Sequence, residues 1–158
     1  MKHDAILHGL ERWDEMLSTG MNRHGRRLLR LSLALVFIWF GALKTLGSSP
    51  ANELVARTVY WLRPEVFLPI LGWWEVAIGV CLLFRPLLRL GLLLLFLQMP
   101  GTFLPFIIVP ERCFEHFPFV LTVEGQYIVK NLVLLGAAVV IGGTIHPAPP
   151  HRKPTAKV

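Results

Sequence analysis

The sequence predicts an all-α integral membrane protein, a four-helix bundle preceded by an amphipathic helix that lies on the membrane surface. Of its 158 residues, 54% are hydrophobic and only 16% are charged, whereas soluble domains carry about 25% charged residues. The mean hydropathy is +0.56, and the apolar residues come in long runs rather than in alternation. These properties exclude an ordinary soluble enzyme, a disordered chain and a coiled coil. Two cysteines are too few for a disulfide scaffold.

Four segments are long and apolar enough to cross a hydrocarbon core, which needs roughly 20 apolar residues per helix. Together they define a membrane domain over residues 28–145, and each is about 28–35 Å long as a helix. The third segment contains Pro100 and Pro105, so we expect a kink in its second half. The four predicted spans are residues 28–46, 66–84, 87–109 and 126–145.

Three further segments lie outside the predicted spans. In the amino-terminal segment 1–27, residues 5–17 place their apolar side chains on one helical stripe. We expect a short amphipathic helix on the membrane surface there, with a docking helix for a partner protein as the alternative. A small external helix is expected over residues 50–62. The proline-containing tail 146–158 is expected to be mobile.

Positive charge is concentrated on one side of the predicted membrane. Eleven Lys and Arg residues lie in or directly beside the amino-terminal segment, the turn between the second and third spans, and the tail, namely Lys2, Arg12, Arg23, Arg26, Arg27, Arg30, Arg85, Arg89, Arg152, Lys153 and Lys157. Loops 47–65 and 110–125 contain only three. Because Lys and Arg accumulate in cytoplasmic loops, we expect both termini to be cytoplasmic. The basic residues are spread over several flanks and do not form the single face that binds nucleic acid, so the expected partner is the lipid bilayer.

Five polar residues lie inside the predicted spans, where lipid disfavours them. Glu75 is the most costly, because a charge at mid-span costs about 2.5–3.5 kcal/mol on insertion scales. Each Leu, Ile, Phe or Val returns only about 0.3–0.6 kcal/mol. The span can therefore insert, but Glu75 is expected to be protonated or paired. The five candidate site residues are Lys44, Glu75, Gln98, Lys130 and Asn131.

Helical spacing indicates the direction in which Glu75 points. Gly72 and Gly79 lie on its helical face, three residues before it and four after it, and small residues mark a face that another helix approaches closely. Glu75 should therefore point into the bundle. All five polar residues fall between the midplane and the outer side. We predict an outward-facing polar site in which Glu75 is approached by Lys44 or Lys130.

A competing interpretation applies to the other four polar residues. Lys44 and Lys130 lie near helix ends, from which long side chains reach the lipid headgroups. Gln98 and Asn131 can connect helices by hydrogen bonds. Glu75 is too deep for such a route, and a mid-span carboxylate is the strongest functional candidate in the chain.

The sequence contains no motif of a self-contained catalyst, and we assign no catalytic and no metal-binding residue. It has no C-x-x-C pair and no His within a span, and nucleophile, P-loop and zinc motifs are missing. Cys113 lies in the outer loop, whereas Cys81 lies about 22 Å below the outer end of its span. A disulfide requires Cα atoms within about 7 Å, so we expect these two cysteines to remain separate.

Three stretches match one known group of membrane proteins. They are RLSLALVFIWFGALK at residues 30–44, GWWEVAIG at 72–79 and EGQYIVKNLVLLGA at 124–137. In these stretches the chain resembles the DoxX-like superfamily, and most closely the branch that contains the bacterial reactive-chlorine-resistance membrane protein. The resemblance extends over residues 26–145. It implies a four-helix bundle in the bacterial inner membrane and a small partner of membrane or periplasmic redox systems.

The resemblance leads to one preferred function and leaves two alternatives open. The preferred hypothesis is an accessory subunit of a redox-stress or quinone-linked membrane system, in which Glu75, Lys44 and Lys130 bind a quinone headgroup or another small polar ligand. No motif identifies a cofactor, and the chain lacks the outward cysteine pair of the redox-thiol relatives. The alternatives are a small transporter with Glu75 as a titrating relay and a purely structural subunit of a larger membrane complex.

Overall fold

The computed structural model describes residues 2–145, and the side chains of residues 13–145. The expected tail 146–158 and the apolar stripe before Trp13 lie outside these described side chains. The chain forms seven α-helices, one 3₁₀ helix and one two-stranded sheet within the described part. These are α1 Lys2–Thr45, α2 Asn52–Thr58, α3 Pro64–Leu83, η1 Arg85–Leu87, α4 Leu88–Phe103, α5 Pro105–Ile108, α6 Pro110–Cys113, β1 Phe114–His116, β2 Val120–Leu121 and α7 Val123–Gly142.

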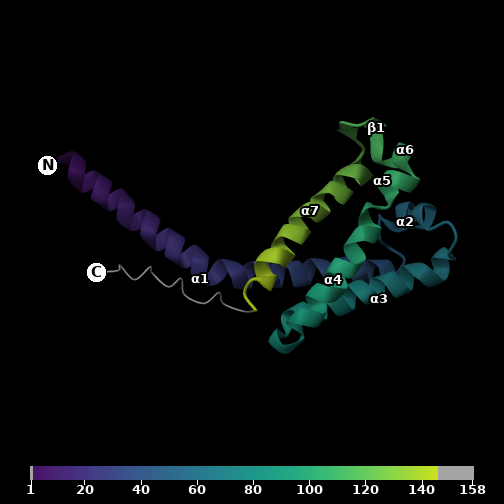
Figure 1. The fold of residues 1–158 in the computed structure, drawn as a ribbon, viewed down its shortest axis with the longest axis horizontal. Coiled ribbons are helices and arrows are strands. Elements are labelled where there is room, and N and C mark those ends of the chain that lie inside the picture. The colour runs from purple at the N-terminus through teal and green to yellow at the C-terminus, as the bar shows by residue number, and fades with distance from the viewer. Residues whose placement is uncertain (1, 146–158) are drawn as a thin grey trace, which may run out of the picture.

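The predicted fold class is confirmed. Four helical segments are long and apolar enough to cross a membrane, namely Trp13–Thr45, Pro64–Leu83, Arg85–Ile108 and Val123–Gly142. Their outward faces carry many large apolar side chains, which is the pattern expected where lipid is the solvent. The chain is therefore a multi-pass membrane protein made of four spanning helices (Figure 1).

The amino-terminal region differs from the separate surface helix that the sequence predicts. Helix α1 is continuous over 44 residues, about 66 Å at 1.5 Å per residue, and its amino-terminal part runs away from the other helices (Figure 1). Gly20 and Gly25 have open space around them, and an isolated glycine costs only about 1 kcal/mol in a helix. Neither one ends α1, so the predicted amphipathic segment and the first span form one helix.

The first span ends in a Schellman motif at Gly47. Its φ of 71° lies in the left-handed region, which glycine adopts without steric cost. The Gly47 amide donates to the Lys44 carbonyl oxygen at 3.1 Å, and the Ser48 amide donates to the Leu43 carbonyl oxygen at 2.9 Å. Beyond this end, α2 begins at Asn52, two residues later than the start predicted from sequence.

The third span is interrupted in its second half, where the two prolines predict a kink. Helix α4 contains Pro100 and ends at Phe103, and α5 begins at Pro105. Pro105 has no amide hydrogen, so the Gly101 carbonyl oxygen instead accepts from the Leu104 amide at 3.3 Å. The helix is therefore interrupted at Leu104 before the chain reaches α6.

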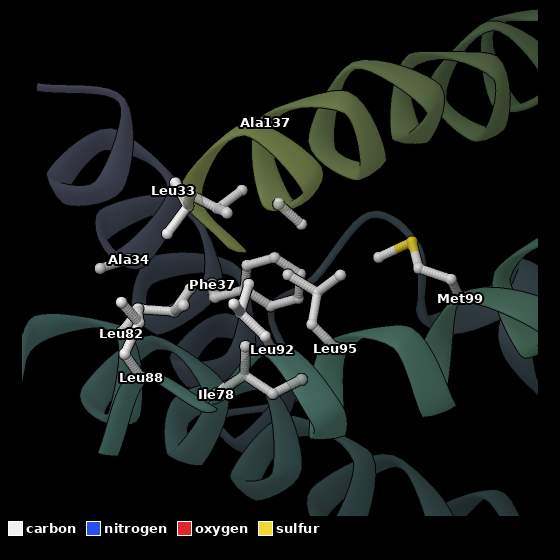
Figure 2. Packing of buried hydrophobic residues seen from close by; sticks show 12 residues of the cluster. Leu33, Ala34, Phe37, Ile78, Leu82, Leu88, Leu92, Leu95, Met99 and Ala137 are labelled. Carbon is white, nitrogen blue, oxygen red and sulfur yellow. The ribbon is translucent and has the colours of Figure 1, made fainter. Parts of the chain in front are cut away.

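The four spans pack in a ring in which each helix has two main neighbours. Helix α3 makes its most extensive contact with α1 and also packs on α4, while α7 contacts α1 and α4. The buried core lies toward the end where α3 turns into α4, and Figure 2 shows side chains from all four spans meeting there. Its members are Leu33, Ala34, Phe37, Ile78, Leu82, Leu88, Leu92, Leu95, Met99, Ala137, Ala138 and Ile141.

The segment between α6 and α7 lies at the opposite end of the bundle. Thr122 caps α7 by accepting from the Gly125 amide at 3.1 Å, and its hydroxyl donates to the Arg112 carbonyl oxygen at 2.6 Å. Strands β1 and β2 form a short antiparallel hairpin. An exposed ion pair, Arg112 Nη2 to Glu53 Oε1 at 3.2 Å, connects α6 with α2.

Candidate functional site

The site is built on a close contact between the backbones of α1 and α3. A Cβ atom added to Gly41 would lie 2.6 Å from the Gly72 carbonyl oxygen, and one added to Gly79 would lie 2.7 Å from the Ala34 carbonyl oxygen. Real Cβ atoms do not approach so closely. Ala34 and Gly41 are seven residues apart, as are Gly72 and Gly79, so two matched small residues on each helix set their register.

Lys44 and Glu75 form a buried ion pair directly beside this contact. Lys44 Nζ donates to Glu75 Oε2 at 2.5 Å, and the two residues are only 9% and 7% exposed. A charged hydrogen bond of this kind is stronger than a neutral one. The predicted approach of Lys44 to Glu75 is therefore present, and the Lys44 side chain does not extend toward the headgroups.

Gln98 of α4 completes the cluster. Its Nε2 donates to Glu75 Oε1 at 2.7 Å, so each carboxylate oxygen of Glu75 accepts one hydrogen bond. Gln98 Oε1 is buried and has no hydrogen-bond partner among the described residues. Buried polar atoms without partners are uncommon, because each forfeits its hydrogen bonds to water. The polar cluster, defined as Lys44, Glu75 and Gln98, therefore retains one vacant acceptor.

Helix lengths place the polar cluster well inside the membrane. Glu75 lies eleven residues after Pro64 and eight before Leu83, which puts it about 17 Å and about 12 Å from the two ends of α3. Helix α1 ends only one residue beyond Lys44. The first span thus stops at the level of the cluster, and α2, which packs against α3 and α5, follows it toward the end of the bundle at which α3 begins.

The structure does not bring Lys130 and Asn131 to Glu75. Lys130 is exposed, and its Nζ lies 4.8 Å from the centroid of the Tyr127 ring on the same helix. Asn131 is half-buried and makes no side-chain hydrogen bond within the described part of the chain. Of the five candidates, three converge and these two remain on α7.

The separation follows from the way α7 crosses the bundle. Its carboxyl-terminal half contributes Ala137, Ala138 and Ile141 to the core, whereas a Cβ added to Gly136 would meet no atom within 4 Å. Figure 1 shows α7 near α1 at its carboxyl end and diverging from it toward its amino end. The residues in the first half of α7 therefore lie at the depth of the polar cluster but away from it.

The two cysteines lie in separate environments. Both are free and buried, Cys81 in α3 and Cys113 at the end of α6. Burial, and then the charges of Glu111 and Glu124, raise the pKa of the Cys113 thiol above its ordinary value. Within residues 13–145, no group of three or more His, Cys, Asp or Glu side chains is placed to hold a metal ion.

Chemically, the polar cluster can orient a small polar group. Lys44 has three N–H donors, of which one is directed at Glu75, and Gln98 offers an unused carbonyl oxygen. A donor and an acceptor are thus available beside a carboxylate. The contribution of Ala34 to the helix contact was not anticipated from sequence, although its seven-residue spacing from Gly41 matches that between Gly72 and Gly79.

Comparison of the chain with protein-family models, with curated proteins and with solved structures finds no match.

Proposed function

We propose that this chain is a DoxX-like inner-membrane protein, an accessory subunit of a redox-stress or quinone-linked membrane system, whose polar cluster binds the polar headgroup of a quinone. The observation that carries this proposal is the buried cluster of Lys44, Glu75 and Gln98 with its vacant Gln98 Oε1. A buried ionisable pair at membrane depth is costly and marks functional sites.

The two redox forms of a quinone match the unused hydrogen-bond donors of Lys44 and the unused acceptor of Gln98. A quinone presents carbonyl oxygens that accept hydrogen bonds, and Lys44 has ammonium donors not directed at Glu75. A quinol presents hydroxyl donors, and Gln98 Oε1 is an acceptor without a partner. Glu75, held between Lys44 and Gln98, supplies a carboxylate beside the same position. Lys130 and Asn131 have no part in this proposal.

We also propose that both termini face the cytoplasm. Support comes from the charges at the two ends of the bundle. Arg23, Arg26, Arg27 and Arg30 lie on α1 before Leu33, its first buried core residue, and Arg85 and Arg89 follow α3 at the same end. The other end carries only three arginines, Arg57, Arg63 and Arg112, among five glutamates, Glu53, Glu65, Glu111, Glu115 and Glu124. This asymmetry is the one that the positive-inside rule relates to orientation.

Equilibrium binding of decylubiquinone to the purified protein in detergent tests the quinone site. Gln98→Leu removes the vacant acceptor and leaves Lys44 opposite Glu75, so it should weaken binding by about tenfold, the effect of one hydrogen bond. The matched control, Asn131→Leu, replaces a half-buried amide on α7 and should leave binding unchanged. Absence of binding to the wild-type protein, or equal losses in both variants, would overturn the site. Stable association with a membrane protein and no quinone would instead support a structural subunit.

A further inference from the structure

The end of the bundle at which α3 turns into α4 carries six arginines. We call it the basic end, and its arginines are Arg23, Arg26, Arg27 and Arg30 of α1, Arg85 of η1 and Arg89 of α4. The nearest acidic residue along α1 is Glu15, fifteen residues before Arg30, or about 22 Å along the helix.

Within residues 13–145, the carboxylates that form ion pairs have partners other than Arg30. Glu75 is engaged with Lys44 near the middle of α3, and Glu53 is engaged with Arg57 and Arg112 at the opposite end of the bundle. After Glu124, at the start of α7, the sequence contains no Asp or Glu. The described part of the chain therefore supplies no ion-pair partner to Arg30.

Arg30 differs from the other arginines of α1 because the bundle holds it in place. Arg23, Arg26 and Arg27 are exposed on the projecting part of the helix, whereas Arg30 is half-buried. Its neighbour Leu29 packs against the core, and Leu33, one turn further on, is 3% exposed. The guanidinium of Arg30 is thus carried on a fixed segment of α1.

The guanidinium of Arg30 lacks an acceptor. Its Nε is buried and has no hydrogen-bond partner among the described residues, and its terminal nitrogens make no hydrogen bond or ion pair to that part of the chain. A planar guanidinium is matched in geometry to phosphate oxygens, which it binds through two parallel N–H donors. The donors of Arg30 are thus available to an anion.

The depth of Arg30 indicates where that anion comes from. Gly79 of α3 meets Ala34 of α1, so Arg30, one turn earlier on α1, lies at the level of Leu83, the last residue of α3. We take the end of α3 as the boundary at which hydrocarbon gives way to headgroups. Leu31 and Leu35 follow on the outer surface of α1 and are 48% and 59% exposed, as expected of side chains that contact acyl chains.

We propose that Arg30 binds the phosphate of an anionic phospholipid at the basic end of the bundle. The terminal nitrogens of Arg30 donate to the phosphate oxygens, and the acyl chains lie along the surface that includes Leu31 and Leu35. The exposed Arg26 and Arg27 add attraction for anionic headgroups without fixing one molecule. This inference is independent of the quinone proposal, because the polar cluster lies more than three helical turns away on α1.

Lipid retention during detergent washing measures this binding. The full-length protein is loaded with dioleoyl phosphatidylglycerol or dioleoyl phosphatidylcholine, washed in detergent, and the retained phosphorus is quantified per chain. The wild-type protein should retain phosphatidylglycerol, and Arg30→Gln should reduce its affinity by about tenfold, the loss of a charge-assisted hydrogen bond. Arg27→Gln, the matched control on the same helix, should retain the lipid as the wild type does.

A third variant and a competition experiment with inorganic phosphate complete the test. Arg30→Lys keeps the charge and loses the planar donor pair, so it should fall between the wild type and Arg30→Gln; this variant remains informative if Arg30→Gln fails to fold. Excess inorganic phosphate should not displace the lipid. Equal losses for Arg27→Gln and Arg30→Gln, equal retention of the two lipids, or displacement by inorganic phosphate would each overturn the proposal.

Discussion

Gly41 of α1 and Gly72 of α3 are in reciprocal backbone contact, so that a Cβ atom on either would lie 2.6–2.7 Å from the carbonyl oxygen of the other. Lys44 and Glu75 each follow one of these glycines by three residues. The contact that brings the two backbones together therefore also buries the ion pair. A single methyl group added at this contact should disturb both.

Gly41→Ala should destabilise the bundle by about 1–3 kcal/mol, the usual cost of overpacking, because the added methyl meets backbone atoms of α3 that cannot rotate away. Thermal unfolding in detergent measures the loss. Gly136→Ala is the matched control, since no atom lies within 4 Å of its Cβ position; it should leave stability unchanged or raise it by up to about 1 kcal/mol. Wild-type stability of Gly41→Ala would contradict the contact.

The ion pair should show strong coupling in a double-mutant cycle. Lys44→Met or Glu75→Leu alone leaves one buried charge without its partner, which costs about 3–5 kcal/mol. The double variant removes both charges, so it should recover most of that loss. The free energy of unfolding in mixed micelles provides the measurement for all four proteins. Additive effects of the two substitutions would show that the charges do not depend on one another.

The Cys113 thiol should resist alkylation at neutral pH. Burial, with Glu111 and Glu124 nearby, raises its pKa, so the reactive thiolate is scarce until the pH passes the ordinary value of 9.0. The same shift lowers stability as the pH rises through 9.0, because the unfolded chain then binds fewer protons than the folded one. Maleimide labelling of a Cys81→Ala variant against pH checks this. Rapid labelling at neutral pH would contradict it.

Reporter fusions should place the two ends of the bundle on opposite sides of the membrane. Alkaline phosphatase, which is active outside the cytoplasm, should be active when fused after Ser48 and inactive when fused after Pro86. The reason is the cluster of arginines at the end that contains Arg85 and Arg89. The reverse pattern of activities would reject the proposed orientation.

Much of the fold follows from local properties of the sequence. The number of spans depends on apolar run length, and the interruption at Leu104 depends on Pro105, so neither requires knowledge of the tertiary structure. The same is true of the face on which Glu75 lies, since Gly72 and Gly79 define it by helical spacing alone. In the structure this face meets α1 at Gly41 and Ala34.

The position of α7 could not be predicted in this way. Counting residues along a span gives the depth of each side chain, and it predicts that Lys130 and Lys44 lie in the same half of the membrane. Which helices touch at that depth depends on the crossing angle, which is set by the packing of Ala137, Ala138 and Ile141 against the core. The continuity of α1 through Gly20 and Gly25 could not be predicted either, because an amphipathic stretch and an apolar stretch can belong to one helix or to two.

The order of the polar cluster along the chain has a consequence for biogenesis. A ribosome delivers Lys44 before Glu75 and Glu75 before Gln98, so the amine is already in the insertion machinery when the carboxylate emerges. Because the glycine contact brings α1 and α3 together as a hairpin, Glu75 can enter the bilayer already neutralised by its neighbour and need not cross as a lone charge. Helix α7, the last of the four spans to be made, adds no side chain to the polar cluster.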